Sequence, residues 1–144
     1  MYVTNLDIYN SSLALIGETT EAINIEDYEE RAPYIIASFC SLNSALDKKI
    51  RDADNLNAAY SFSSVYLSLE LEFPLCEKLV SAASLYTASM LVIDEDTDLS
   101  DSLYDKYCDN ISSIEAYYSS KKSTGTENAI KVTTESISER YFFD

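Results

Sequence analysis

The chain has 144 residues, of which 47% are hydrophobic, and its formal net charge at pH 7 is −15. This length permits one domain with a core of its own and is too short for two, while the hydrophobic share excludes a wholly disordered chain. The charge argues against binding of duplex DNA through its phosphates, because that affinity comes from clustered Lys and Arg, and the ten basic residues are scattered.

The residue types that most enzyme chemistry needs are missing or widely spaced. There is no histidine, which removes the commonest general base and metal ligand, and no nucleophile elbow, phosphate-binding loop or zinc pattern occurs. Cys40, Cys76 and Cys108 form no closely spaced pair, as in a cytosolic chain with reduced thiols. No apolar run reaches membrane-spanning length. We therefore expect neither an enzyme nor a cofactor or bound metal, and no membrane contact.

Only two glycines and two prolines occur, which favours helices joined by short polar loops. Residues 3–16 are predicted to form the first helix, with Gly17 as its C-terminal cap. Residues 18–30 are acidic and are predicted as a loop held down by Ile23 and Ile25. The apolar residues of the helix predicted at 3–16 recur every three or four positions and so share one face. They are Val3, Leu6, Tyr9, Leu13 and Ile16.

A second helix is predicted to begin near Pro33, because proline is tolerated in the first turn of a helix, and to end near Ile50. A start at Asp27 would require a kink at Pro33. Residues 52–64 are small and polar and predict a loop. The buried stripe of this helix should contain Ile35, Phe39, Leu42, Leu46 and Ile50.

Residues 65–73 change to a two-residue period, which is typical of a half-buried strand. Every second residue of this segment is apolar, and the residues between are polar or tyrosine. The apolar positions are Val65, Leu67, Leu69, Leu71 and Phe73. Because a lone strand leaves its edges unpaired, we expect it to pair elsewhere in the chain or with another subunit.

Two more helices are predicted after this segment. Pro74 opens the third, whose buried row is Leu75, Leu79, Ala82, Tyr86 and Met90, flanked by Ala83, Leu85 and Ile93. The fourth runs from about Leu99 to Ser119 and buries Leu103, Tyr107, Ile111, Ile114 and Tyr118. The predicted fold is therefore mainly α, a small four-helix bundle with one extended or β segment at about 65–73 and an extended C-terminal tail.

The last part of the chain is predicted to lie outside the bundle. Residues 119–128 form a polar linker around Gly125, and residues 129–144 contain a β-like patch at Ile130 and Val132 before an aromatic tip, Tyr141, Phe142 and Phe143. We divide the chain into a helical domain, residues 1–119, and a linker with a docking tail, residues 120–144.

The acidic run at residues 94–98 suggests a calcium loop, because Asp94, Asp96 and Asp98 occupy its first, third and fifth positions. Leu99 stands where such a loop needs glycine, and Asp105 where it needs a bidentate glutamate. A loop between two helices, with Asp98 or Ser100 capping the second, is the better interpretation.

Twelve tyrosines are the most unusual feature of the composition. Tyrosine is enriched at protein interfaces, because it combines a large rigid area with a polar tip. It also replaces phenylalanine at the margins of cores. We expect both roles, about equally, among six that lie off the predicted core faces: Tyr28, Tyr34, Tyr60, Tyr66, Tyr104 and Tyr117.

Residues 6–118 resemble the head-to-tail adaptor (connector) proteins of tailed bacteriophages. The first half of the resemblance is Leu13-Ala14-Leu15-Ile16-Gly17-Glu18, the loop Ile23-Asn24-Ile25-Glu26-Asp27, and a helix with Ala32, Phe39 and Leu46. The second half is Phe73-Pro74-Leu75 before a helix with Ala82-Ala83 and Ala88, the acidic loop 94–98, and Leu103 and Tyr107 on the last helix.

The resemblance implies a structural virion protein, assembled in the cytoplasm of the bacterial host. Copies of it, commonly twelve, would form a ring beneath the portal protein, extend the DNA channel and dock the next adaptor or the tail, with DNA only as passing cargo. The candidate contacts with sister subunits or the portal are Val65, Tyr66, Leu67, Leu69, Leu71, Ile130, Val132, Tyr141, Phe142 and Phe143. The alternatives are a cytosolic helical regulator that binds one partner as a monomer or dimer, and an acidic DNA-mimic inhibitor.

Overall fold

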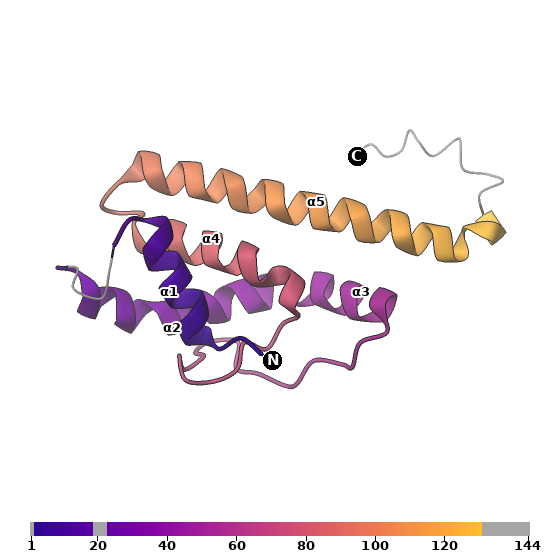
Figure 1. Ribbon diagram of the computed structural model, residues 1–144, viewed down its shortest axis with the longest axis horizontal. Coiled ribbons are helices and arrows are strands. Elements are labelled where there is room, and N and C mark those ends of the chain that lie inside the picture. The colour runs from indigo at the N-terminus through magenta and orange to yellow at the C-terminus, as the bar shows by residue number, and fades with distance from the viewer. Residues whose placement is uncertain (1, 19–22, 131–144) are drawn as a thin grey trace.

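The computed structural model describes residues 2–18 and 23–130, with the backbone alone for residues 121–130. These residues form α-helices and one 3-10 helix, and no β-strand (Figure 1). The helices are α1 (Asn5–Leu15), α2 (Ile25–Leu42), α3 (Ser44–Asp54), η1 (Glu77–Leu79), α4 (Val80–Leu91) and α5 (Thr97–Ile130). The prediction of a mainly helical bundle is confirmed.

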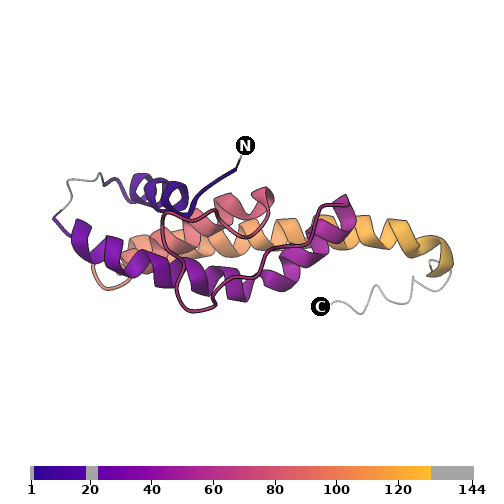
Figure 2. The same ribbon diagram turned by 90° about the horizontal axis from the view of Figure 1, so that it is seen from below.

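Helix α4 is the centre of the bundle, because it packs against α1, α2 and α5 (Figures 1 and 2). Its small residues Ala82, Ala83 and Ala88 are fully buried and bring the neighbouring backbones close. The main aromatic cluster of the core surrounds Phe39 of α2, whose ring contacts Phe73, Tyr86 and Tyr107. One core therefore joins α2, α4, α5 and the segment before η1.

Both ends of α1 carry the signals that define a helix. Thr4 and Asp7 form a capping box at its start. Gly17 has a φ of +74° at its end, as predicted for the cap, and the Glu18 N–H donates to the Leu13 carbonyl at 2.8 Å. The predicted face was wrong in part, because Ile8 is fully buried while Leu6 is 43% exposed.

The second predicted helix is two helices. Helix α2 begins at Ile25, eight residues before Pro33, and encloses this proline, so the predicted loop at residues 18–30 ends earlier than expected. The chain then breaks at Asn43, whose side chain donates to the Phe39 carbonyl at 3.0 Å and to the Tyr107 hydroxyl at 3.2 Å. These competing hydrogen bonds mark the junction of α2 and α3. Leu42, predicted in the buried stripe, is 64% exposed.

The predicted strand at residues 65–73 is an extended segment with one antiparallel bridge, between Thr4 and Glu72. It is anchored by backbone hydrogen bonds to the start of the chain and to Pro33 of α2. A turn from Ser68 to Leu71 interrupts it, which explains why no ladder forms. The alternation still predicted burial at two positions, Leu67 and Phe73, but Val65 and Leu71 are exposed.

The last two predicted helices are present with shifted ends. The third begins at Glu77 as a 3-10 turn rather than at Pro74, and Ile93, predicted to flank its buried row, is 45% exposed. The predicted row of the fourth is confirmed, with Leu103, Tyr107 and Tyr118 buried. Helix α5 continues to Ile130 and passes the end of α3 (Figure 1). The predicted end of this helix at Ser119 was therefore wrong, and residues 119–128, predicted as a polar linker, belong to α5.

Candidate functional site

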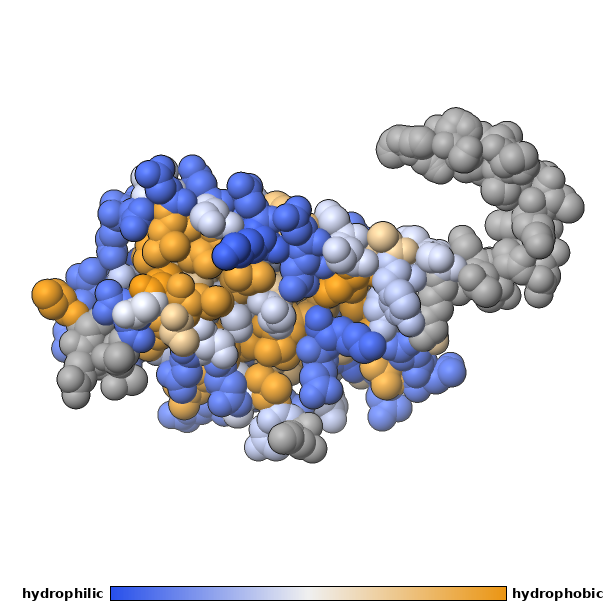
Figure 3. All heavy atoms as spheres, turned by 45° about the horizontal axis from the view of Figure 1, so that its top comes forward, coloured by the Kyte–Doolittle hydropathy of each residue, from blue (hydrophilic) through white to orange (hydrophobic). Residues whose placement is uncertain are grey.

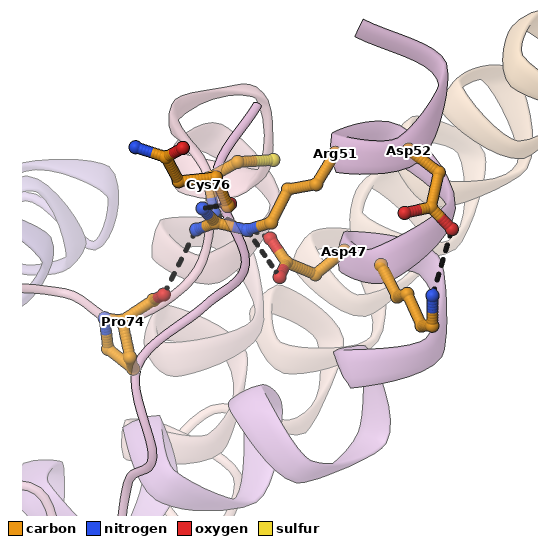
Figure 4. A network of polar contacts seen from close by, with 7 residues as sticks. Asp47, Arg51, Asp52, Pro74 and Cys76 are labelled. Carbon is orange, nitrogen blue, oxygen red and sulfur yellow. Dashed lines mark hydrogen bonds and ion pairs between the residues drawn. The ribbon is translucent and has the colours of Figure 1, made fainter. Parts of the chain in front are cut away.

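The segment between α3 and η1, residues 55–76, lies across α2 and α3 (Figure 2) and is fastened by a buried ion pair. The Asp47 carboxylate, 3% exposed, accepts from the Arg51 Nε at 2.8 Å and from the Cys76 N–H at 2.7 Å. The Arg51 guanidinium also donates to the carbonyls of Asn57 at 2.8 Å and Pro74 at 3.2 Å (Figure 4). One charged pair on α3 thus holds both ends of the segment.

Two cavities flank this ion pair. One of about 260 Å³ lies between α3 and the segment, and one of about 340 Å³ lies between the segment and the start of the chain. Both are lined by Arg51, Leu56, Ala58 and Leu75. The smaller cavity also contains Phe62, Ala59 and the exposed ion pair of Lys48 with Asp52, 2.9 Å apart.

The outer side of the segment carries part of the predicted interface. Val65 is 65% exposed, Leu71 is 55% exposed and Tyr66 is 46% exposed, with the Tyr66 ring meeting Tyr34 of α2 edge to face at 5.1 Å. Leu67 and Leu69 point inward and pack in the core of their own chain. The remaining candidates, Val132, Tyr141, Phe142 and Phe143, lie outside the described residues, as does the side chain of Ile130.

A third hollow, an open groove of about 660 Å³, runs between α1 and α4. Sequence reasoning missed it, because its lining comes from exposed positions on both helices that no single apolar stripe contains. Figure 3 looks onto this side of the molecule, where apolar atoms gather between borders of hydrophilic ones. The lining includes Val3, Ala14, Leu15, Val80 and Leu85, with Glu77 as its charged member.

The six tyrosines off the predicted core faces are unevenly divided. Tyr28 is a core residue, 2% exposed, and its hydroxyl donates to Glu95 at 2.6 Å. The other five are between 40% and 77% exposed: Tyr34, Tyr60, Tyr66, Tyr104 and Tyr117. The structure thus places one of the six in the core and five at the surface.

The acidic loop at residues 94–98 serves the fold. The Asp96 carboxylate accepts from the Leu99 N–H at 3.0 Å and so caps α5, a role that we predicted for Asp98 or Ser100. Ser100 instead donates to the Ser89 carbonyl of α4 at 2.8 Å. No group of three His, Cys, Asp or Glu residues within the described part of the chain is arranged to hold a metal ion.

The buried cysteines are poor nucleophiles. Burial is the main reason that the pKa of the Cys76 thiol is raised to about 11, with the Asp47 charge adding to it. Burial also raises the pKa of the Cys40 thiol well above its ordinary value. Because the thiolate is the reactive form, both side chains are inert at neutral pH.

None of the family models, curated proteins and solved structures compared with the chain matches it significantly. Across residues 2–18 and 23–130, no helix is both long enough and apolar enough to cross a bilayer.

Proposed function

We propose that this chain is a structural protein at the head–tail junction of a tailed bacteriophage, where copies of it form a ring beneath the portal. In this proposal the ring extends the DNA channel and presents a docking surface to the next adaptor or to the tail. The resemblance of residues 6–118 to the adaptor family is its starting point, and virion assembly takes place in the host cytoplasm.

The observation that carries the proposal is the exposed apolar and aromatic surface of residues 55–76. Tyr60 is 77% exposed, and Val65 and Leu71 are more than half exposed, although the segment is fastened to the body at both ends by Arg51. A surface held at both ends suits protein docking, because less conformational entropy is lost on binding than from a free loop. The net charge of −15 also suits a channel through which DNA slides without adhering.

The test is assembly with the portal protein encoded in the same genome. Size-exclusion chromatography with light scattering should show a monomer alone and a ring-sized complex after mixing with the portal. Replacing Val65 and Tyr66 with Ser should weaken this complex by about tenfold or more, as expected for interface anchors.

The matched control is Ile23→Ser, which removes a side chain that is 98% exposed just before the start of α2 and should leave assembly intact. A source genome without a portal gene, or a chain that stays monomeric with the portal and instead binds one cytosolic protein, would contradict the proposal in favour of the regulator.

A further inference from the structure

The cavity of about 260 Å³ beside α3 combines apolar walls with a charged rim. Its walls contain Leu56, Ala58, Ala59, Phe62 and Leu75. A cavity of about 150 Å³ with apolar walls is enough to bind benzene. The space beside α3 therefore accommodates an aromatic side chain.

The charges at the rim favour one kind of occupant. Asp47 pairs with Arg51 and Asp52 pairs with Lys48, so the four charged residues of the lining cancel. Elsewhere the body is strongly acidic, because residues 1–119 hold 21 of the 25 acidic and six of the ten basic side chains, and hence the whole net charge of −15. An aromatic segment with flanking acids meets least repulsion at a neutral site.

The chain contains such a segment beyond the described residues. Tyr141-Phe142-Phe143 is its densest aromatic run, and Glu139 and Arg140 precede it while Asp144 follows it. Residues 135–144 contain three acids and one basic residue, a net charge of −2. Aromatic rings of this kind gain most from a partly closed apolar cavity.

The length of chain after α5 is sufficient for this run to reach the cavity of its own molecule. The Tyr118 hydroxyl donates to Asp54 at the end of α3, at 2.7 Å, which places α5 beside α3. A path back along α5 from Ile130 to Tyr118 and then along α3 measures about 35 Å at 1.5 Å per residue. Phe142 lies twelve residues beyond Ile130, and an extended chain of that length reaches about 40 Å.

We propose that the aromatic run Tyr141-Phe142-Phe143 docks into the cavity between α3 and residues 55–62 of the same chain. The tether keeps the run near the cavity of its own molecule at any protein concentration, which favours this cavity over that of a second copy in dilute solution. The proposal does not rest on the head–tail function.

Hydrogen exchange of the full chain, followed by mass spectrometry, tests the proposal. Replacing Tyr141, Phe142 and Phe143 with Ser should speed exchange of the amides in residues 56–62 by about fivefold or more, because the docked run shields them. Ile137→Ser is the matched control in the same tail and should leave these rates unchanged. Ala58→Trp fills the cavity from inside and should speed exchange in residues 141–143.

Circular dichroism confirms that each variant keeps its helices, so that a change of exchange reports docking and not unfolding. Equal exchange in residues 56–62 with and without the three aromatic rings would overturn the proposal. Protection that appears only at high protein concentration would overturn it as well, because the run would then occupy a second copy. Portal binding is not part of the readout, so failure here and failure of the proposed function are distinguishable.

Discussion

At the scale of single residues, Asp47 links α3 to the segment at residues 55–76 by polar contacts outside the apolar core. Its carboxylate is buried, and it is shared between the Arg51 guanidinium and the Cys76 backbone. Replacing it with Ala would leave the Arg51 guanidinium, 17% exposed, without its counter-charge, and the Cys76 N–H without its acceptor. Removing one member of a buried pair is costly, while the pair as a whole stabilises little, because both charges were desolvated to form it.

We therefore expect Asp47→Ala to lower the free energy of unfolding by about 3 kcal/mol, and Asp47→Asn by less, because the amide oxygen still accepts from Cys76. Urea denaturation measures both. Asp52→Ala is the control, because Asp52 pairs with Lys48 at the surface. The Asp52 side chain is 68% exposed and the Lys48 side chain is 76% exposed, so this ion pair contributes less than about 1 kcal/mol. Equal losses for Asp47→Ala and Asp52→Ala would show that the buried pair does not fasten the segment.

At the scale of elements, Gly17 ends α1 for a reason of backbone conformation alone. Its φ is +74°, and a Cβ there would meet no atom within 4 Å, so Gly17→Ala tests strain without a clash. We expect a loss of about 1 kcal/mol, which corresponds to a fall in melting temperature of about 3–5 °C for a domain of this size.

Two further variants decide whether that loss comes from the left-handed conformation. Gly17→Asn should lose less, because asparagine tolerates it. Asn10→Ala, at an exposed position inside α1, should be neutral or stabilising. An unchanged melting temperature for Gly17→Ala would contradict the prediction, because it would show that α1 does not need a left-handed glycine at its end.

The helices were predictable from the sequence because apolar spacing is a local signal, and the cap at Gly17 followed from the same spacing. The ends were less predictable. Pro33 lies inside α2 because burial of Tyr28 and Ala32 outweighs the local preference for proline in a first turn. Asn43 breaks the helix through a hydrogen bond to Tyr107, 64 residues away, which no local pattern reveals.

The candidate site was predictable only in part, for a similar reason. The exposed positions Val65, Tyr66 and Leu71 lie in a segment that we predicted as a strand from its two-residue period. The segment is extended but forms no strand. In the sequence, Asp47 and Arg51 have the i,i+4 spacing of an ordinary ion pair on a helix surface. Its burial depends on residues 55–76 folding over it, and that contact is a property of the tertiary structure.

At the scale of the whole molecule, charge decides how copies behave before they meet a partner. The net charge of −15 lies on the helical body, and copies of such a body repel one another over the Debye length. The exposed apolar residues on the segment and in the α1–α4 groove favour association. Long-range repulsion wins over these short contacts at low ionic strength, and salt reverses the balance, because screening weakens repulsion without weakening apolar burial.

We therefore expect the purified chain to be monomeric at low salt and to self-associate increasingly as salt rises to about 0.5 M, where the Debye length is only about 4 Å. Sedimentation velocity at several protein concentrations measures the mean mass. Asp101, Asp105 and Asp109 are exposed at successive turns of α5, and replacing all three with Asn should move the onset of association to lower salt. Three exposed polar residues on the same helix, Ser102, Ser112 and Ser113, provide the uncharged control when replaced with Ala. A mean mass that falls with salt would show that ion pairs between copies, and not apolar contacts, drive their association.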